Sequence, residues 1–284
     1  MTTFAKAVRD YEKLCRKNDV PEETVMAYLV ELSQQERYSL YLHYEEEMPS
    51  DLKERFDAGM ARILRQEPMA HVLGYSWFYG YRMTVNPDVL IPREETEELC
   101  AHILSRIDSL FADQPTVECA DVGTGSGAIA ITIAKEERRV RMRATDISEE
   151  ALETARLNAA NNGADVSFAA GDMLAPLIAQ KAMLDVLISN PPYIPAQEKM
   201  ERSVVDYEPH VALFGGEDGL KFYREIFHSC RRILKPRAMM AFEMGWDQRE
   251  RMSALVQEVL PEARFEILRD MNGKDRMLFV YLGM

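Results

Sequence analysis

The chain has 284 residues, of which 47% are hydrophobic, and its formal net charge is −13 at pH 7. This length accommodates one large or two modest domains with a real hydrophobic core. The negative charge disfavours a surface built to neutralise nucleic-acid phosphates. No apolar run approaches the ~20 residues of a membrane span. We therefore expect neither a nucleic-acid partner nor a membrane association.

The cysteines and histidines show no metal-binding or disulfide pattern. The four cysteines lie far apart in the sequence without a C-x-x-C motif, and the five histidines lack the spacing of metal ligands. Widely spaced cysteines of this kind are typical of reduced thiols in an intracellular protein. We expect a cytoplasmic protein without a metal.

Residues 1–73 carry the apolar periodicity of helices only. Phe4 and Val8 lie on one face of a first helix, and similar stripes follow along the segment. Ser33 with Glu36 predicts a capping box at the start of a later helix. The pattern predicts a small helical bundle, and its apolar stripes indicate core packing rather than chemistry.

Residues 75–85 are aromatic and rich in β-formers around Gly80, which predicts a hairpin between the two halves of the chain. A loop with Arg93 follows, and Thr96 is expected near the start of an amphipathic helix. Two interpretations of Arg93 stay open: it pairs with a carboxylate at a pocket, or it is an exposed structural arginine.

Strands and helices alternate through the remainder of the chain, which predicts a mostly parallel sheet with ligands at its carboxyl edge. The strand at 117–122 enters a glycine loop in which Gly123, Gly125 and Ala128 satisfy G-x-G-x-x-G/A. Such a loop lets a ligand approach the backbone and the amides of a helix N-terminus. About 20 residues later a second strand ends at Asp146, where a carboxylate suits ribose hydroxyls. These features fit NAD and S-adenosylmethionine equally.

Two further strands end in candidate site residues. After the strand near 166–169, Asp172 is placed to take an adenine amino group and Met173 to pack on the ring. The apolar strand 184–189 ends in the sequence NPPY (190–193), because two prolines cannot donate ladder hydrogen bonds. A planar NH2 group can donate to the Asn190 side-chain oxygen and the following carbonyl, with an aromatic ring nearby.

The order of these four motifs resembles that of class I S-adenosylmethionine-dependent methyltransferases, among which NPPY marks enzymes that methylate a planar nitrogen. The whole chain resembles the PrmC/HemK family, the N5-glutamine methyltransferases of peptide chain release factors. The resemblance rests on IPREETE (91–97), DVGTGSG (121–127), NPPYI (190–194) and the segment 208–224. One departure is Glu94, where the family usually shows a second proline.

The resemblance implies an α/β fold: a Rossmann-like, mostly parallel sheet with an antiparallel C-terminal hairpin and a small N-terminal helical bundle. The expected domains are a substrate-recognition domain at 1–73, a hairpin linker at 74–92 and a methyltransferase domain at 93–284. A purely structural role for the helical domain stays open. We expect a monomer, although the sequence leaves the oligomeric state open.

The implied reaction transfers a methyl group from S-adenosylmethionine, which becomes S-adenosylhomocysteine, to the glutamine amide of the Gly-Gly-Gln motif in class 1 release factors. The predicted catalytic residues are Asn190, Pro191 and Tyr193. The predicted cofactor-binding residues are Gly123, Thr124, Gly125, Ser126, Gly127, Asp146, Asp172, Met173 and Asn190. The predicted substrate-binding residues are Asn190, Pro191, Pro192, Tyr193 and Arg93.

Three other functions compete with this one. A nucleic-acid N6-adenine or N2-guanine methyltransferase would use the same NPPY loop, but the acidity of the chain disfavours it. A dehydrogenase would explain the glycine loop and leave the NPPY loop without a role. A non-catalytic binding module would not need motifs after all four strands.

Overall fold

The computed structural model describes residues 2–198 and 202–284, which form two compact units. The helical unit contains the chain up to Tyr75 together with a short segment that includes α10 (Arg202–Val205). Within this unit the Tyr207 hydroxyl donates to the Arg65 carbonyl at 3.1 Å. The sheet unit contains the rest of the chain.

The helical unit is built from short amphipathic helices, as predicted for residues 1–73. Its N-terminal helices are α1 (Phe4–Lys17), α2 (Glu23–Ser33), α3 (Arg37–Leu42), α4 (Ser50–Ile63) and α5 (Met69–Leu73). Thr3 caps α1 by accepting from the Lys6 amide at 3.2 Å. Val8, Leu29 and Phe56 are completely buried in one shared core.

The predicted capping box of Ser33 and Glu36 is wrong. Ser33 is the last residue of α2, and its hydroxyl donates backward to the Val30 carbonyl at 3.3 Å. Gln34 follows in the left-handed conformation with φ of 54° and ends the helix. The next helix begins at Arg37 without a side-chain cap.

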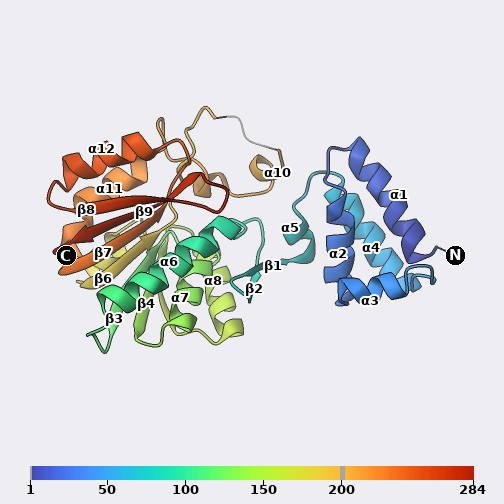
Figure 1. Ribbon diagram of the computed structural model, residues 1–284, viewed down its shortest axis with the longest axis horizontal. Coiled ribbons are helices and arrows are strands. Elements are labelled where there is room, and N and C mark those ends of the chain that lie inside the picture. The colour runs from blue at the N-terminus through green and yellow to red at the C-terminus, as the bar shows by residue number, and fades with distance from the viewer. Residues whose placement is uncertain (1, 199–201) are drawn as a thin grey trace. The chain divides into compact units, whose positions relative to one another are not determined.

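The sheet unit contains a seven-stranded sheet in the order β5-β4-β3-β6-β7-β9-β8 (Figure 1). Its strands are β3 (Val117–Val122), β4 (Val140–Asp146), β5 (Val166–Ala170), β6 (Leu184–Ser189), β7 (Leu234–Glu243), β8 (Arg264–Arg269) and β9 (Asp275–Leu282). The strands β3 to β7 pair in parallel, and β9 pairs antiparallel with both β7 and β8. The predicted fold class is confirmed.

Helices cover both faces of this sheet. Figure 1 shows α6 (Glu94–Leu110), α7 (Ala128–Glu136) and α8 (Glu149–Asn162) on one side, and α11 (Lys221–Ser229) and α12 (Arg249–Val259) on the other. The shorter elements are α9 (Ala175–Ala179), η1 (His210–Ala212) and η2 (Cys230–Arg232). In the described parts of the chain, no helix combines the length and the apolar character needed to cross a bilayer.

The predicted hairpin is present as β1 (Tyr75–Phe78) and β2 (Tyr81–Thr84). Its two turn residues, Tyr79 and Gly80, both have positive φ, as a tight two-residue turn requires. Buried Asn158 on α8 accepts from the Thr84 amide at 2.7 Å and donates to the Thr84 carbonyl at 3.0 Å. The Asn158 side-chain amide also donates to the Ser126 carbonyl at 2.9 Å, which joins the hairpin to the glycine loop.

Helix α6 begins at Glu94, so Thr96 lies near its start, as expected. Glu94 occupies the first helical position, where proline is also well tolerated because its missing amide hydrogen has no helical partner there. A carboxylate at this position is favoured by the helix dipole. The unusual glutamate therefore preserves the helix start that a proline would provide.

Candidate active site

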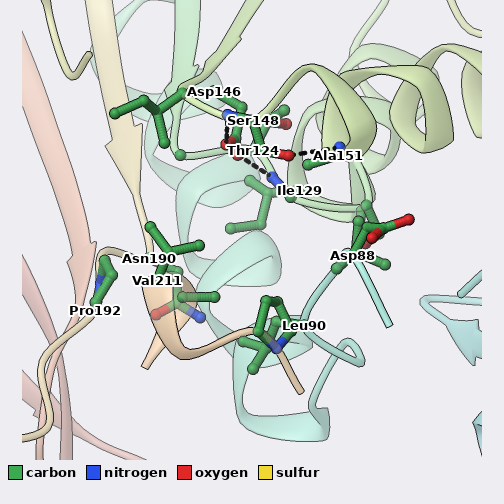
Figure 2. A pocket seen from close by; sticks show the side chains of 18 of the residues that line it. Asp88, Leu90, Thr124, Ile129, Asp146, Ser148, Ala151, Asn190, Pro192 and Val211 are labelled. Carbon is green, nitrogen blue, oxygen red and sulfur yellow. Dashed lines mark hydrogen bonds between the residues drawn. The ribbon is translucent and has the colours of Figure 1, made fainter. Parts of the chain in front are cut away.

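A cavity of about 280 Å³ lies within the sheet unit, at the carboxyl ends of the parallel strands (Figure 2). This is the edge at which open α/β sheets bind ligands. The structure brings most of the predicted site residues to it. Those that line the cavity are Arg93, Gly123, Thr124, Gly125, Ser126, Asp146, Asp172, Met173, Asn190 and Pro192.

The glycine loop between β3 and α7 has two functions in the structure. Gly123 and Gly125 have φ of 72° and 54°, and a Cβ atom built on either would meet nothing within 4 Å. Gly127 is different, because a Cβ there would lie 3.1 Å from both the Ala155 Cβ and the Ile131 Cδ1. The first two glycines thus keep backbone open to the cavity, whereas Gly127 allows α7 to pack on α8.

Asp146, at the end of β4, holds the glycine loop. Its Oδ2 accepts from the Gly125 amide at 2.8 Å, and its Oδ1 accepts from the Ser148 amide at 3.0 Å. Ser148 in turn caps α8 by accepting from the Ala151 amide at 3.0 Å. Each carboxylate oxygen has two lone pairs, so both retain capacity for a ligand hydroxyl.

Asp121, at the end of β3, is a completely buried carboxyl that the sequence analysis did not assign to the site. Its Oδ2 accepts from the Thr124 hydroxyl at 2.6 Å, whereas its Oδ1 has no hydrogen-bond partner among the described residues. Burial, with a smaller effect of nearby Asp146, raises the pKa of Asp121 to about 7. A cationic group bound above the glycine loop would favour the charged form.

The remaining walls of the cavity are largely apolar. Met173 is buried and adopts the left-handed conformation, with φ of 41°. Other walls come from the loop before α6 and from the segment 209–222, which overlap the sequence stretches 91–97 and 208–224 singled out above. The cavity-lining residues that the sequence analysis did not predict include Asp88, Val89, Leu90, Thr96, Ile129, Ile147, Ser148, Val211, Ala212, Lys221 and Phe222.

The NPPY loop contributes a half-buried amide to the cavity. The Asn190 Nδ2 lies 3.4 Å from the Thr96 Oγ1, to which it donates. Tyr193 lies behind the cavity, where its hydroxyl donates to the Glu243 Oε1 at 3.3 Å. Burial, followed by nearby Glu243, raises the pKa of Tyr193. Three predicted residues, Gly127, Pro191 and Tyr193, are outside the lining, and their roles stay predictions.

Two glycines of the segment after Glu208 pack closely against the backbone of the NPPY loop. A Cβ at Gly215 would lie 2.4 Å from the Pro192 carbonyl oxygen, and one at Gly219 would lie 2.2 Å from the Tyr193 carbonyl oxygen. The Gln248 Nε2 donates to the same Tyr193 oxygen at 3.0 Å. Only glycine permits such an approach of two backbone segments, so a larger residue at Gly215 or Gly219 would displace the NPPY loop.

Arg93 pairs with a carboxylate of the protein itself. Its guanidinium donates to the Oε1 of Glu208, a residue that is only 4% exposed. The other oxygen, Oε2, accepts from the Ile91 amide at 3.2 Å. The pair joins the loop before α6 to the segment that begins at Glu208. The predicted contact of Arg93 with a substrate stays a prediction.

Comparisons with known proteins first define the class. Residues 102–207 match the family described as "Methyltransferase small domain". The fold resembles that of a methyltransferase from Pyrococcus furiosus with a TM-score of 0.53 and 18% identity, over 80% of this chain and 98% of that one. That likeness concerns the fold alone. The sheet order and the site at its carboxyl edge are those of class I methyltransferases, a class that uses S-adenosylmethionine.

The family follows from closer relatives. Residues 6–74 match the "PrmC N-terminal domain". The chain is 40% identical over 259 residues to the release factor glutamine methyltransferase of Bacillus cereus, covering 90% of each chain. It is 39% identical over 262 residues to that of Neisseria gonorrhoeae, covering 91% of this chain and 92% of the relative. The chain belongs to the PrmC/HemK family of release factor glutamine methyltransferases, which confirms the resemblance.

Proposed function

We propose that this protein transfers a methyl group from S-adenosylmethionine to the side-chain amide nitrogen of glutamine in the Gly-Gly-Gln motif of class 1 release factors. The observation that carries the proposal is the Asn190 amide, held by Thr96 at one wall of a cavity whose opposite wall is the glycine loop. We place the reaction in the cytoplasm, and we propose that the enzyme is a monomer.

The residues around the cavity fit S-adenosylmethionine. The open backbone at Gly123 and Gly125 suits the methionine part. The buried Asp121 carboxyl, which does not line the cavity but is bonded to Thr124 of the glycine loop, would attract the positive charge of that part. We assign the ribose hydroxyls to Asp146. The adenine then belongs to Asp172 and Met173, which line the same cavity.

The chemistry requires alignment more than a strong base. Bound S-adenosylmethionine supplies an electrophilic methyl group on its sulfonium sulfur. An amide nitrogen is a weak nucleophile because its lone pair is delocalised, so the protein has to orient it and stabilise its developing charge. We assign one N–H to the Asn190 Oδ1 and the other to the Pro191 carbonyl. We also assign to the substrate amide Pro192, which lines the cavity, and Tyr193, which lies outside the lining.

The decisive test is mass spectrometry of a class 1 release factor incubated with the enzyme and the methyl donor. We expect one added methyl group on the glutamine of the Gly-Gly-Gln motif. The matched control is the same factor with Gly-Gly-Ala, which should gain none. Methylation of that control at another residue would contradict the proposed acceptor. Methylation of DNA or RNA in a parallel assay would favour the nucleic-acid alternative, which the net charge of −13 disfavours.

We further propose that residues 1–73 recognise the body of the release factor, that 74–92 link the domains and that 93–284 form the catalytic domain. A tripeptide motif buries too little area to select one protein, so a second contact surface is needed. The helical unit carries an open groove with a volume of about 1510 Å³, whose lining includes apolar Met26, Val30 and Met69 beside exposed Arg37.

The recognition role is tested by charge reversal in this groove. We expect Arg37→Glu to lower activity on the intact factor and to leave activity on a short Gly-Gly-Gln peptide unchanged. Lys13→Glu, an exposed cation outside the groove lining, is the matched control. An equal effect of Arg37→Glu on both substrates would contradict recognition by this groove.

A further inference from the structure

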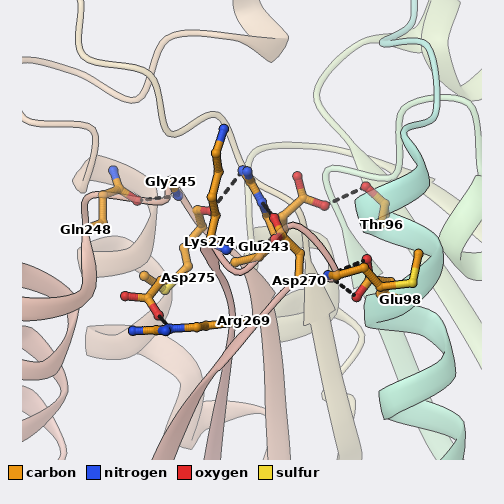
Figure 3. A network of polar contacts seen from close by, with 12 residues as sticks. Thr96, Glu98, Glu243, Gly245, Gln248, Arg269, Asp270, Lys274 and Asp275 are labelled. Atoms are coloured by element: carbon orange, nitrogen blue, oxygen red, sulfur yellow. Dashed lines mark hydrogen bonds and ion pairs between the residues drawn. The ribbon is translucent and has the colours of Figure 1, made fainter.

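One buried carboxylate joins the NPPY loop to the start of α6. Glu243, the last residue of β7, is 3% exposed and does not line the cavity. Figure 3 shows its side chain next to that of Thr96. Its Oε2 accepts from the Thr96 hydroxyl at 2.5 Å. Its Oε1 accepts from the Tyr193 hydroxyl at 3.3 Å. One carboxylate thus receives hydrogen bonds from α6 and from the NPPY loop.

These hydrogen bonds have a direction. A threonine hydroxyl carries a single hydrogen, and Thr96 donates it to Glu243. The Thr96 oxygen therefore presents only a lone pair to Asn190, whose Nδ2 donates to it at 3.4 Å. If the Asn190 amide were flipped, its oxygen would face the lone pair of Thr96, and two acceptors would oppose each other.

We propose that Glu243, acting through Thr96, is a positioning residue that directs the oxygen of the Asn190 amide toward the bound substrate. The inference rests on the proposed function, because a substrate NH2 group needs an acceptor there. A flipped Asn190 would offer it a donor instead. The same carboxylate holds the Tyr193 hydroxyl and so steadies the other end of the NPPY loop.

The surroundings hold Glu243 in place for this function. The Tyr223 hydroxyl on α11 donates to the Glu243 backbone carbonyl at 2.7 Å, which anchors the end of β7. Burial raises the pKa of Glu243, whereas Thr96, Arg276 and Tyr193 each favour its carboxylate form. Thr96 and Tyr193 both donate to Glu243, and these two hydrogen bonds set the direction of the chain through Thr96.

The sheet also offers a matched control. Asp185, near the amino end of β6, is a completely buried carboxyl like Glu243. Its Oδ2 accepts from the Lys235 ammonium at 2.6 Å and from the Glu118 amide at 2.8 Å. It is bonded to no residue that lines the cavity among those the structure describes. Loss of its charge therefore tests the general effect of removing a buried carboxylate.

The first experiment is Glu243→Gln, assayed with the release factor and with a Gly-Gly-Gln peptide. Glutamine has the same shape but also donates, so Thr96 is no longer forced to present a lone pair to Asn190. We expect kcat to fall about tenfold to a hundredfold, the scale of a misplaced catalytic group. The calorimetric Kd for S-adenosylmethionine should stay within about twofold, since no atom of Glu243 lines the described cavity.

A second pair of variants separates orientation from packing and does not depend on Glu243→Gln folding. Thr96→Val removes the hydroxyl at nearly constant shape, and we expect the same loss in kcat. Thr96→Ser keeps the hydroxyl and should recover most of that loss. The double variant Glu243→Gln with Thr96→Val should lose no more than either single variant, because both break one chain of hydrogen bonds.

The outcomes are distinguishable. If the wild-type enzyme does not methylate a release factor, the proposed function fails. If the wild type is active and kcat of Glu243→Gln or Thr96→Val stays within about twofold of it, the positioning role fails. Equal losses in Thr96→Ser and Thr96→Val would also refute it. A similar loss per folded molecule in Asp185→Asn would show a general structural effect and refute it as well.

Discussion

The two ends of the parallel strands use buried carboxylates in opposite ways. Near the amino end of β6, Asp185 pairs with Lys235, and neither residue is among those that line the site cavity. At the carboxyl end of β7, Glu243 receives two hydroxyl groups, one of which continues to Asn190 at the cavity wall. The same chemical group closes an ion pair at one end and orients a site residue at the other.

The difference follows from the architecture of a parallel sheet. Crevices form outside the carboxyl ends of the strands, where successive loops diverge. Polar groups there have a free side that can bind a ligand, as at Asp146 and Asn190. Substitutions at the carboxyl end should therefore change binding or turnover, whereas substitutions at the amino end should change stability alone.

The largest effect is expected at Asn190. Asn190→Ala removes the acceptor that we assign to the substrate amide, and turnover should fall about a hundred- to a thousandfold, as for loss of an oxyanion-hole donor. Much of the affinity for S-adenosylmethionine should remain in calorimetry. Single-turnover rates within a few-fold of wild type at saturating substrate would show that Asn190 does not orient the amide.

Asp146→Ala should chiefly weaken cofactor binding. Hydrogen bonds to a charged group contribute roughly 1.5–3 kcal/mol each, so loss of even one ribose hydroxyl contact should raise the Kd for S-adenosylmethionine about tenfold to a hundredfold. The variant also loses the acceptor of the Gly125 amide, which loosens the glycine loop. An unchanged Kd in a folded variant would contradict the ribose assignment.

At the amino end, Lys235→Met should leave turnover per folded molecule unchanged. It leaves the buried Asp185 carboxyl without its cation, and an unsatisfied buried group costs about 1–3 kcal/mol, more if it is charged. Chemical denaturation followed by an intrinsic fluorescence signal should report this loss. A change in kcat without a change in stability would contradict the claim that substitutions at the amino end affect stability alone.

The smallest effect is expected in the pH dependence of stability. The pKa of Asp121 is raised to about 7, chiefly by burial, so the folded state binds this proton more tightly than the unfolded state. The contribution of this proton to the free energy of unfolding is complete below about pH 4 and is lost as pH rises through 7. Without methyl donor, Asp121→Asn should therefore melt progressively higher than wild type between pH 5 and 8. A pH-independent difference in Tm would contradict this assignment.

Local sequence patterns were sufficient for much of the molecule. The apolar runs that became β3 to β7, the glycine loop and the end of β6 at Asn190 all depend on backbone preferences over a few residues. Their order along the chain was enough to predict a parallel sheet with its motifs at one edge. One failure was also local: the capping box was lost to a left-handed Gln34, whereas Thr96 does lie near the start of α6 as predicted.

By itself the sequence determined which strands end in site residues, because proline, glycine and β-branched residues act on the backbone where they stand. Only the tertiary structure decided which side chains meet behind those ends. Glu243 reads in the sequence as the last residue of an apolar strand, and Thr96 reads as a residue of a helix start. Their hydrogen bond joins positions 147 residues apart, and it forms because α6 packs against β7. Such a contact depends on sheet order and helix packing, which no local pattern encodes.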